Sequence, residues 1–203
     1  MAVPEPVARV VDTMSTFVAE WFLCGGWAVD AWIGRQTRDH ADLDIAVFHD
    51  DQRAIFDHLA GWQLIGHDDQ VDDDSTEPWD GRRLELPAHI HARSQDGSEL
   101  EVVLNDRSGD DWIFSREPHI SLPLPRCTQL SAWGLPAVGP EVILFYKAHP
   151  PVWRDDPPSE LRPHDELDFL GLLPELSEKQ RGWLREAISL VRPGHSWLSR
   201  LSR

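Results

Sequence analysis

The sequence predicts an α/β protein, with helices and strands mixed over residues 1–125 and a mainly helical region over residues 126–203. In the first part, short apolar segments typical of strands alternate with segments whose apolar residues recur at helical spacing. After a proline-rich stretch at residues 122–140, the remaining patterns are those of helices. We therefore expect a core of sheet and helices that is followed by a helical C-terminal region.

The elements expected in the N-terminal third follow from apolar spacing and from glycine positions. Gly25 and Gly26 follow a short apolar strand and precede a helix, and Gly34 is the expected cap at the end of that helix. Asp50 is the expected cap of the next helix. The elements, in order, are helix 7–21, strand 22–24, helix 27–33, strand 43–48, helix 50–60 and strand 62–65.

The middle of the chain begins with an acidic segment and continues as strands. Residues 66–81 contain seven carboxylates and predict a solvent-exposed loop. The Asp96-Gly97 turn predicts a hairpin between the strands expected at 89–93 and 99–104. Strands are expected at 83–86, 89–93, 99–104, 112–114 and 119–122, and helices at 141–148, 165–172 and 177–191.

The composition describes a globular chain with a strong negative charge. Its 203 residues are 41% hydrophobic, which is enough for a core without disulfides or a structural metal. A net charge of -16 repels the phosphates of DNA and RNA, so we expect no nucleic-acid partner. No apolar segment approaches the roughly 20 residues that cross a membrane, and two cysteines give no disulfide framework. We therefore expect a cytoplasmic protein without a membrane partner.

A pair of aspartates carries the clearest chemical signal. Asp42 and Asp44 are separated by one residue at a predicted strand, so both project from the same face, roughly 6 to 7 Å apart at the backbone. Two carboxylates this close repel each other, and a hard divalent cation such as Mg²⁺ offsets that repulsion. Glu101, an acid in an otherwise apolar strand, is the expected third carboxylate, and Glu99 on the same face is the alternative.

The Gly25-Gly26 pair predicts an anion-binding turn. Between a strand and the start of a helix, free backbone N–H groups and the helix dipole favour a phosphate. A phosphate-binding turn beside a paired-aspartate metal site is the arrangement that phosphoryl or nucleotidyl transfer requires. For the two glycines taken alone, a tight turn without a ligand is the alternative.

The segment GGWAVDAWIGRQTRDHADLDIAV resembles the nucleotidyltransferase superfamily of the DNA polymerase β fold. It is similar in particular to the branch of aminoglycoside 2''-adenylyltransferases and lincosamide nucleotidyltransferases, in which GGWA, TR-x-H and D-hydrophobic-D occur at this spacing. The detailed match covers residues 22–48, and a weaker likeness extends through Glu101 and Lys147 to the acidic helix at Asp165. The resemblance implies a nucleotidyltransferase fold, with a mixed β-sheet flanked by helices and a helical C-terminal extension.

The resemblance also implies roles for individual residues. Relatives generally carry Asp at the third carboxylate, where this chain has Glu101, so a role as metal ligand or as general base stays open for this residue. The implied catalytic and metal-binding residues are Asp42, Asp44 and Glu101, and the implied nucleotide-binding residues are Gly25, Gly26, Arg38 and Lys147.

The activity that the resemblance implies is Mg²⁺-dependent transfer of a nucleoside monophosphate from a nucleoside triphosphate, with ATP as the expected donor. The expected acceptor is a hydroxyl of a small molecule of the aminoglycoside type, because a strongly negative protein attracts a polycation. One alternative is transfer to an endogenous metabolite or a protein. Another is a component of a toxin–antitoxin pair of the minimal nucleotidyltransferase type. The oligomeric state stays open.

Several further residues have both a structural and a functional interpretation. Asp30 either holds the loop after its helix by accepting N–H bonds or takes part in the site. Asp165 and Asp168 either stabilise the N-terminus of a late helix or receive an ammonium group of the substrate. Trp79 and Trp112, which lie next to acidic segments, are candidates for stacking on a base or a sugar.

Overall fold

The computed structural model describes residues 2–68, 76–148 and 161–202 of the chain. The helices are α1 (Glu5–Met14), α2 (Gly25–Ile33), α3 (Gln52–His58), α4 (Leu124–Cys127), α5 (Pro140–Ala148), α6 (Pro163–Leu172), α7 (Glu178–Val191) and α8 (Leu198–Leu201). The strands are β1 (Trp21–Leu23), β2 (Asp44–Phe48), β3 (Gln63–His67), β4 (Ala88–Arg93), β5 (Glu99–Ser108), β6 (Asp111–Ile113), β7 (Ser121–Pro123), β8 (Thr128–Leu130) and β9 (Pro136–Val138). Among these residues, no helix is both long and apolar enough to cross a membrane.

The described strands form one mixed sheet, as the resemblance implies. Its main path runs β3-β4-β5-β2-β1-β9-β8, and β6 and β7 extend from the end of β5. The β2–β5 and β1–β9 pairs are parallel, whereas β3–β4, β4–β5, β1–β2 and β8–β9 are antiparallel. Strands β8 and β9 come after the expected boundary at residue 125, so the sheet includes strands from both sides of that boundary.

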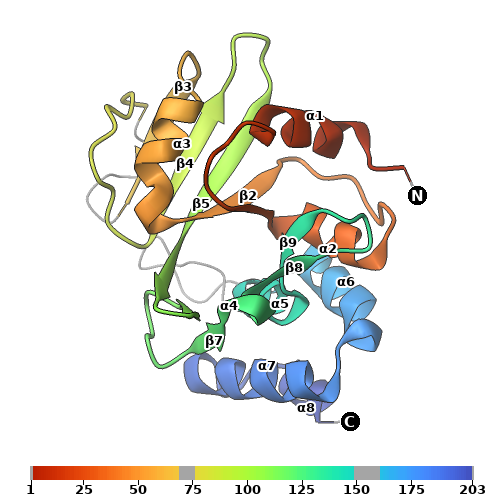
Figure 1. The fold of residues 1–203 in the computed structure, drawn as a ribbon. Coiled ribbons are helices and arrows are strands. Elements are labelled where there is room, and N and C mark those ends of the chain that lie inside the picture. Colours follow the sequence, from red (N-terminus) through yellow and green to blue (C-terminus); the bar gives the residue numbers. More distant parts are fainter. Residues whose placement is uncertain (1, 69–75, 149–160, 203) are drawn as a thin grey trace.

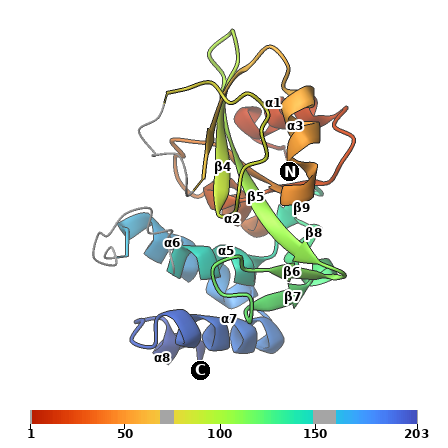
Figure 2. The same ribbon diagram turned by 90° about the vertical axis from the view of Figure 1, so that its left-hand side faces the viewer.

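Helices cover the sheet and then extend away from it. Figure 1 shows α1 and α3 beside the strands β2 to β5, with α7 and α8 at the opposite end of the molecule. Figure 2 shows α5 and α6 between the sheet and α7. Helix α5 packs against α7, and α2 packs against both α5 and α6. The layer formed by α2, α5 and α6 therefore joins the sheet to the helical end of the chain.

Two predicted elements are wrong in the structure for identifiable reasons. The helix expected at 7–21 ends at Met14, where the hydroxyls of Thr13 and Ser15 donate to the carbonyls of Arg9 and Asp12, a local alternative to a continued helix. The strand expected at 83–86 is absent. The amide of Leu84 donates to the Gln52 side chain at 2.7 Å, so it takes a side chain as partner in place of a neighbouring strand.

Other differences concern burial and the proline-rich stretch. Within the segment expected to be a solvent-exposed loop, His67 and Asp68 are buried, and residues 69–75 lie outside the described part. Trp79 and Trp112 are buried core residues, so neither is positioned to stack on a ligand. The strand expected at 119–122 overlaps β7, whereas α4, β8 and β9 in the proline-rich stretch were not predicted by the sequence patterns. The expected cap at Asp50 is also wrong, since a 3-10 turn at His49–Asp51 precedes α3.

Candidate active site

Three predicted carboxylates meet at the centre of the sheet. Asp44 is the first residue of β2 and pairs in register with Glu101 of the parallel strand β5. Asp42 precedes β2 by two residues. One carboxylate oxygen from each of the three acids lies within 4.8 Å of the others. The structure therefore brings Asp42, Asp44 and Glu101 together, whereas the alternative acid Glu99 is exposed and forms an ion pair with Arg93.

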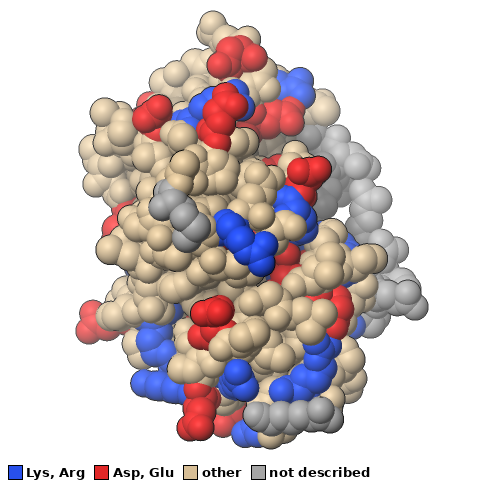
Figure 3. Space-filling model, turned by 90° about the vertical axis from the view of Figure 1, so that its right-hand side faces the viewer, with Lys and Arg blue, Asp and Glu red and all other residues tan. Residues whose placement is uncertain are grey.

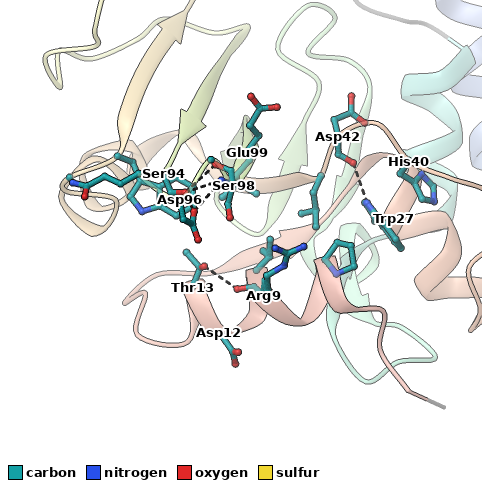
Figure 4. Close-up of a pocket in the computed structure, with 18 of the residues that line it drawn as sticks. Arg9, Asp12, Thr13, Trp27, His40, Asp42, Ser94, Asp96, Ser98 and Glu99 are labelled. Atoms are coloured by element: carbon teal, nitrogen blue, oxygen red, sulfur yellow. Dashed lines mark hydrogen bonds between the residues drawn. The ribbon is translucent and has the colours of Figure 1, made fainter.

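Asp42 is held in place by a tryptophan of the neighbouring helix. The indole N–H of Trp27 in α2 donates to the backbone carbonyl of Asp42 at 3.1 Å, as the dashed line in Figure 4 shows. The ring of Trp27 also packs against the imidazole of His40, with 4.3 Å between the ring centroids. The loop that carries the first aspartate is therefore fixed to the helix that begins with the two glycines.

Burial and the neighbouring carboxylates perturb the pKa of Asp44. Burial, the charge of Glu101 and the charge of Asp42 raise the pKa of Asp44 to about 7, while Lys147 and His40 act in the opposite direction. Burial and the same three carboxylates also raise the pKa of the Cys24 thiol, which stays protonated at neutral pH. A divalent cation bound between the carboxylates would offset their repulsion and favour the ionised form of Asp44. This donor set fits the oxygen ligands that Mg²⁺ prefers.

The glycine pair allows the backbone to approach these acids. Gly25 has a φ of +60°, and a Cβ at this position would lie 2.8 Å from Cγ of Asp44 and closer still to its carboxylate oxygen. A Cβ at Gly26 would lie 2.7 Å from Cε1 of His40 and 2.5 Å from a guanidinium nitrogen of Arg38. The two glycines thus open helix α2, whose first N–H groups have no partner within the helix. Both positions require glycine because side chains of the site occupy the space beside them.

The predicted basic residues are anchored by acids of α6. The Arg38 guanidinium donates from two nitrogens to the two carboxylate oxygens of Asp168, at 3.2 and 3.0 Å. The ammonium group of Lys147, on α5, lies 2.9 Å from an oxygen of Asp165 and 2.7 Å from an oxygen of Asp168. Arg162 donates to the other oxygen of Asp165 at 2.9 Å. Asp165 and Asp168 are almost fully buried, and together they hold these three cations in position.

The balance between burial and charge is visible at Asp168. Burial by itself would raise the pKa of this carboxyl, but the hydrogen bonds and charges of Arg38 and Lys147 lower it below its ordinary value. The acid is therefore ionised at neutral pH and holds both cations. The sequence left the role of Asp168 open, because only the folded chain shows that Lys147, and Arg38 from 130 residues away, reach it.

One cavity of about 660 Å³ is lined by both groups of charges. Its acidic lining residues are Asp39, Asp42, Asp44 and Glu101, and its basic lining residues are Arg38, Arg116, Lys147 and Arg162. Arg116 and Arg162 were not predicted from the sequence, which gives no local signal for them. A larger depression of about 910 Å³ adjoins this cavity at Ala41 and Asp42 and lies between α1 and the β4–β5 turn (Figure 4). An anion with several charges is better accommodated in the first cavity, since four basic residues line it.

The sequence pattern of the family described as aminoglycoside-2''-adenylyltransferase matches residues 6–120, which is more than half of the chain and includes the glycine pair and all three acids. The chain belongs to this family. It is therefore a nucleotidyltransferase. No curated protein matches the chain.

Solved structures support the fold of this aminoglycoside-2''-adenylyltransferase family member. The lincomycin-bound lincosamide antibiotic adenylyltransferase LnuA has a TM-score of 0.56 at 16% identity, covering 85% of this chain and 97% of that chain. The solution structure of the antibiotic-resistance factor ANT(2'')-Ia has a TM-score of 0.57 at 17% identity, covering 93% and 92%. ANT(2'')-Ia in complex with adenylyl-2''-tobramycin has a TM-score of 0.56 at 16% identity, covering 91% and 96%. At these identities the likeness concerns the fold.

The acid of α2 has a structural role in this family member. Asp30 is buried and accepts hydrogen bonds from the amide of Thr37, at 3.0 Å, and from its hydroxyl. Its second oxygen lies 2.6 Å from Nε2 of His40. Asp30 therefore holds the loop between α2 and β2, and it positions His40, a neighbour of Gly26.

Proposed function

We propose that this chain is a Mg²⁺-dependent adenylyltransferase that moves the adenylyl group of ATP to a hydroxyl of an aminoglycoside-type antibiotic and releases pyrophosphate. The observation that carries the proposal is the cavity in which three converging carboxylates and four basic side chains face the same space. A metal ion needs the first group and a triphosphate needs the second. Membership of the family supports the reaction class.

Asp42 and Asp44 would hold the magnesium ion, with Glu101 beside them as a third ligand or as the general base. When bound there, Mg²⁺ neutralises negative charge on the phosphate oxygens and on the carboxylates. The residues of this chain supply its site in a fixed form, because the register of β2 and β5 and the Trp27 hydrogen bond set the positions of all three acids. Little reorganisation is then needed when the substrates arrive.

The triphosphate would lie between the N-terminus of α2 and the cations Lys147, Arg38 and Arg162, which the acids of α6 hold in place. Backbone N–H groups at Gly25 and Gly26 donate to phosphate oxygens, and the helix dipole favours their charge. Lys147 points its ammonium group into the same cavity from a side chain that is 9% exposed. Because Asp165 and Asp168 hold this lysine, it is positioned before the nucleotide binds.

Glu101 is the expected acceptor of the proton that leaves the attacking hydroxyl, or else a third ligand of the metal. Its side chain is 31% exposed and reaches the cavity from β5. The two roles differ in an observable way. If Glu101 is the base, Glu101→Gln lowers kcat and leaves the Mg²⁺ affinity unchanged. If Glu101 is a metal ligand, Glu101→Gln lowers the Mg²⁺ affinity as well.

The proposed acceptor follows from the charge of the protein and from the family. A net charge of -16 attracts a polycation, and acidic and basic side chains are interspersed on the face in Figure 3, without a continuous basic track among the residues drawn in colour. A nucleic-acid acceptor is therefore disfavoured. The KM of an aminoglycoside should rise with ionic strength, and the KM of a lincosamide should change little. An endogenous metabolite or a protein is the alternative acceptor.

The test is pyrophosphate release by the purified chain with Mg²⁺, each of the four nucleoside triphosphates, and a panel of aminoglycosides and lincosamides. We expect acceptor-dependent release with ATP, reduced at least about a hundredfold in Asp44→Asn. Circular dichroism shows whether the variant is folded. A folded Asp44→Asn protein with nearly unchanged turnover would contradict the metal assignment, and release without any dependence on these antibiotics would contradict the acceptor.

We also propose a cytoplasmic location, where ATP and Mg²⁺ are available. The support is that Cys24 and Cys127 are both free thiols in the structure, as expected in a reducing compartment.

A further inference from the structure

Three histidines that the sequence analysis did not single out lie together on the sheet beside the active site. His67 ends β3 and pairs in register with His89 of β4. His91 follows two residues later on β4, so its side chain projects from the same face as that of His89. The ring centroids of all three pairs are 4.8 Å apart. The cluster therefore comes from two adjacent strands with a fixed register.

The same sheet face carries the acids of the active site. His91 pairs in register with Glu101 of β5, and Glu101 pairs in register with Asp44 of β2. Residues in register on neighbouring strands have their side chains on one face of the sheet. Nitrogen donors on β3 and β4 are thus followed directly by oxygen donors on β5 and β2. His89 also lines the 660 Å³ cavity, so the cluster borders the space in which the substrates would bind.

The arrangement of the ring nitrogens fits a transition-metal ion. One ring nitrogen of each histidine lies within 4.8 Å of the others. Zinc bound to three imidazoles at about 2.0–2.1 Å in tetrahedral geometry needs nitrogen donors about 3.4 Å apart. Rotation of the side chains can bring the three nitrogens from within 4.8 Å of one another to this spacing. His67 and His89 are buried, whereas the side chain of His91 is 52% exposed. A metal would therefore have a protein wall on one side and an accessible position on the other.

A carboxylate next to the cluster supports the same interpretation. Nε2 of His91 lies 3.9 Å from a carboxylate oxygen of Glu101. Histidines that bind metals commonly direct their second ring nitrogen to a carboxylate, which fixes the tautomer and makes the ligand more basic. The side chain of His91 can offer Nδ1 to a metal while Nε2 faces Glu101. The alternative is a cluster of packed, uncharged imidazoles without a ligand.

We propose that His67, His89 and His91 form a second metal site, which takes a divalent transition metal, Zn²⁺ foremost, and is distinct from the oxygen site for Mg²⁺. Imidazole nitrogen suits Zn²⁺, Ni²⁺ and Cu²⁺, while Mg²⁺ selects carboxylate oxygen. The proposal does not depend on the proposed function, since no residue of the histidine set belongs to the acid set. The shared sheet face places the two sites next to each other, with Glu101 between them.

The test uses the full-length chain, stripped with EDTA and titrated with Zn²⁺ or Co²⁺ alone. Calorimetry measures Zn²⁺ binding, and the visible spectrum of bound Co²⁺ reports four-coordinate nitrogen ligation. We expect one tight Zn²⁺ site and a tetrahedral Co²⁺ spectrum. His91→Gln should weaken Zn²⁺ binding at least about tenfold, and its half-exposed position makes it the variant that disturbs the fold least.

Two matched variants distinguish the histidine site from a surface histidine and from the oxygen site. His119→Gln removes a histidine whose side chain is 88% exposed and far along the chain from the cluster, so Zn²⁺ affinity should stay unchanged. Asp44→Asn removes an acid of the oxygen site and should leave Zn²⁺ affinity within about twofold. Equal affinity of His91→Gln and His119→Gln would overturn the proposal. So would loss of Zn²⁺ binding in Asp44→Asn alone, or a wild-type Co²⁺ spectrum without nitrogen ligation.

Discussion

Replacing Gly25 by alanine tests how closely the backbone must approach the acids. The position has a φ of +60°, where an L side chain costs about 1–2 kcal/mol. The new Cβ would lie 2.8 Å from Cγ of Asp44, whereas carbon atoms in contact are about 3.5–4.0 Å apart. The Asp44 carboxylate must therefore move away from its place beside Asp42 and Glu101. We expect Gly25→Ala to lose both stability and activity.

Gly134→Ala is the matched control for the backbone effect. Gly134 has a φ of +72°, and an added Cβ there meets nothing within 4 Å. In a chain of this size, a loss of 1–2 kcal/mol corresponds to a fall in Tm of roughly 2–8 °C, and we expect this fall in both variants. Only Gly25→Ala should also lose at least about a hundredfold in kcat/KM, because only it displaces Asp44, the proposed metal ligand.

The assays are differential scanning calorimetry for Tm and pyrophosphate release for kcat/KM. The reasoning fails if Gly25→Ala keeps most of its activity while its Tm falls as in the control. It also fails if Gly134→Ala loses as much activity as Gly25→Ala, because a general loss of stability would then account for both.

Three more predictions concern the charges of the site. Glu101→Gln should lower kcat about a hundredfold in steady-state assays, and Glu99→Gln, two residues away and exposed, should not; equal effects would refute the choice of Glu101. Lys147→Met should raise the KM for ATP and lower the urea-measured free energy of unfolding by roughly 3 kcal/mol, since its two buried carboxylate partners each lose a cation; an unchanged KM would contradict nucleotide binding. The pKa of Asp44 is raised to about 7, so this acid is more easily protonated in the folded state than in the unfolded one. Metal-free protein should therefore lose stability as the pH rises from about 4 through about 7, and Mg²⁺ should raise Tm more at pH 8 than at pH 6; the reverse order would refute the assigned repulsion.

Local sequence patterns were sufficient to predict the role of a residue where that role depends on its neighbours along the chain. The carboxylates of Asp42 and Asp44 lie close together, as their spacing predicted, and Gly34 ends α2 with a positive φ as predicted. The helix expected at 177–191 is α7, and a capping box at Ser177 fixes its start. Such signals act over a few residues, so the sequence indicates them, although the cap expected at Asp50 was wrong.

Contacts between segments that are far apart in the sequence could not be predicted from local patterns. Thr37 and His40 settle the role of Asp30 over a few residues, but only the packing of α6 against α2 and α5 brings Asp168 to Arg38 and Lys147. The strands β8 and β9 are short and proline-flanked, and the pairing of β9 with β1 and of β8 with β9 exists only in the assembled sheet.

The α/β class, the glycine turn, the acid pair and the family to which they belong could all be predicted before the chain was seen folded. The sequence already favoured Glu101 over Glu99 as the third acid, because Glu101 lies in an otherwise apolar strand, but only the register of β2 on β5 places Glu101 beside Asp44. Register also joined His67 to His89 and His91, across a stretch of chain that carries no histidine motif. Spacing along the chain is a local property, whereas register is set by the packing of the whole sheet.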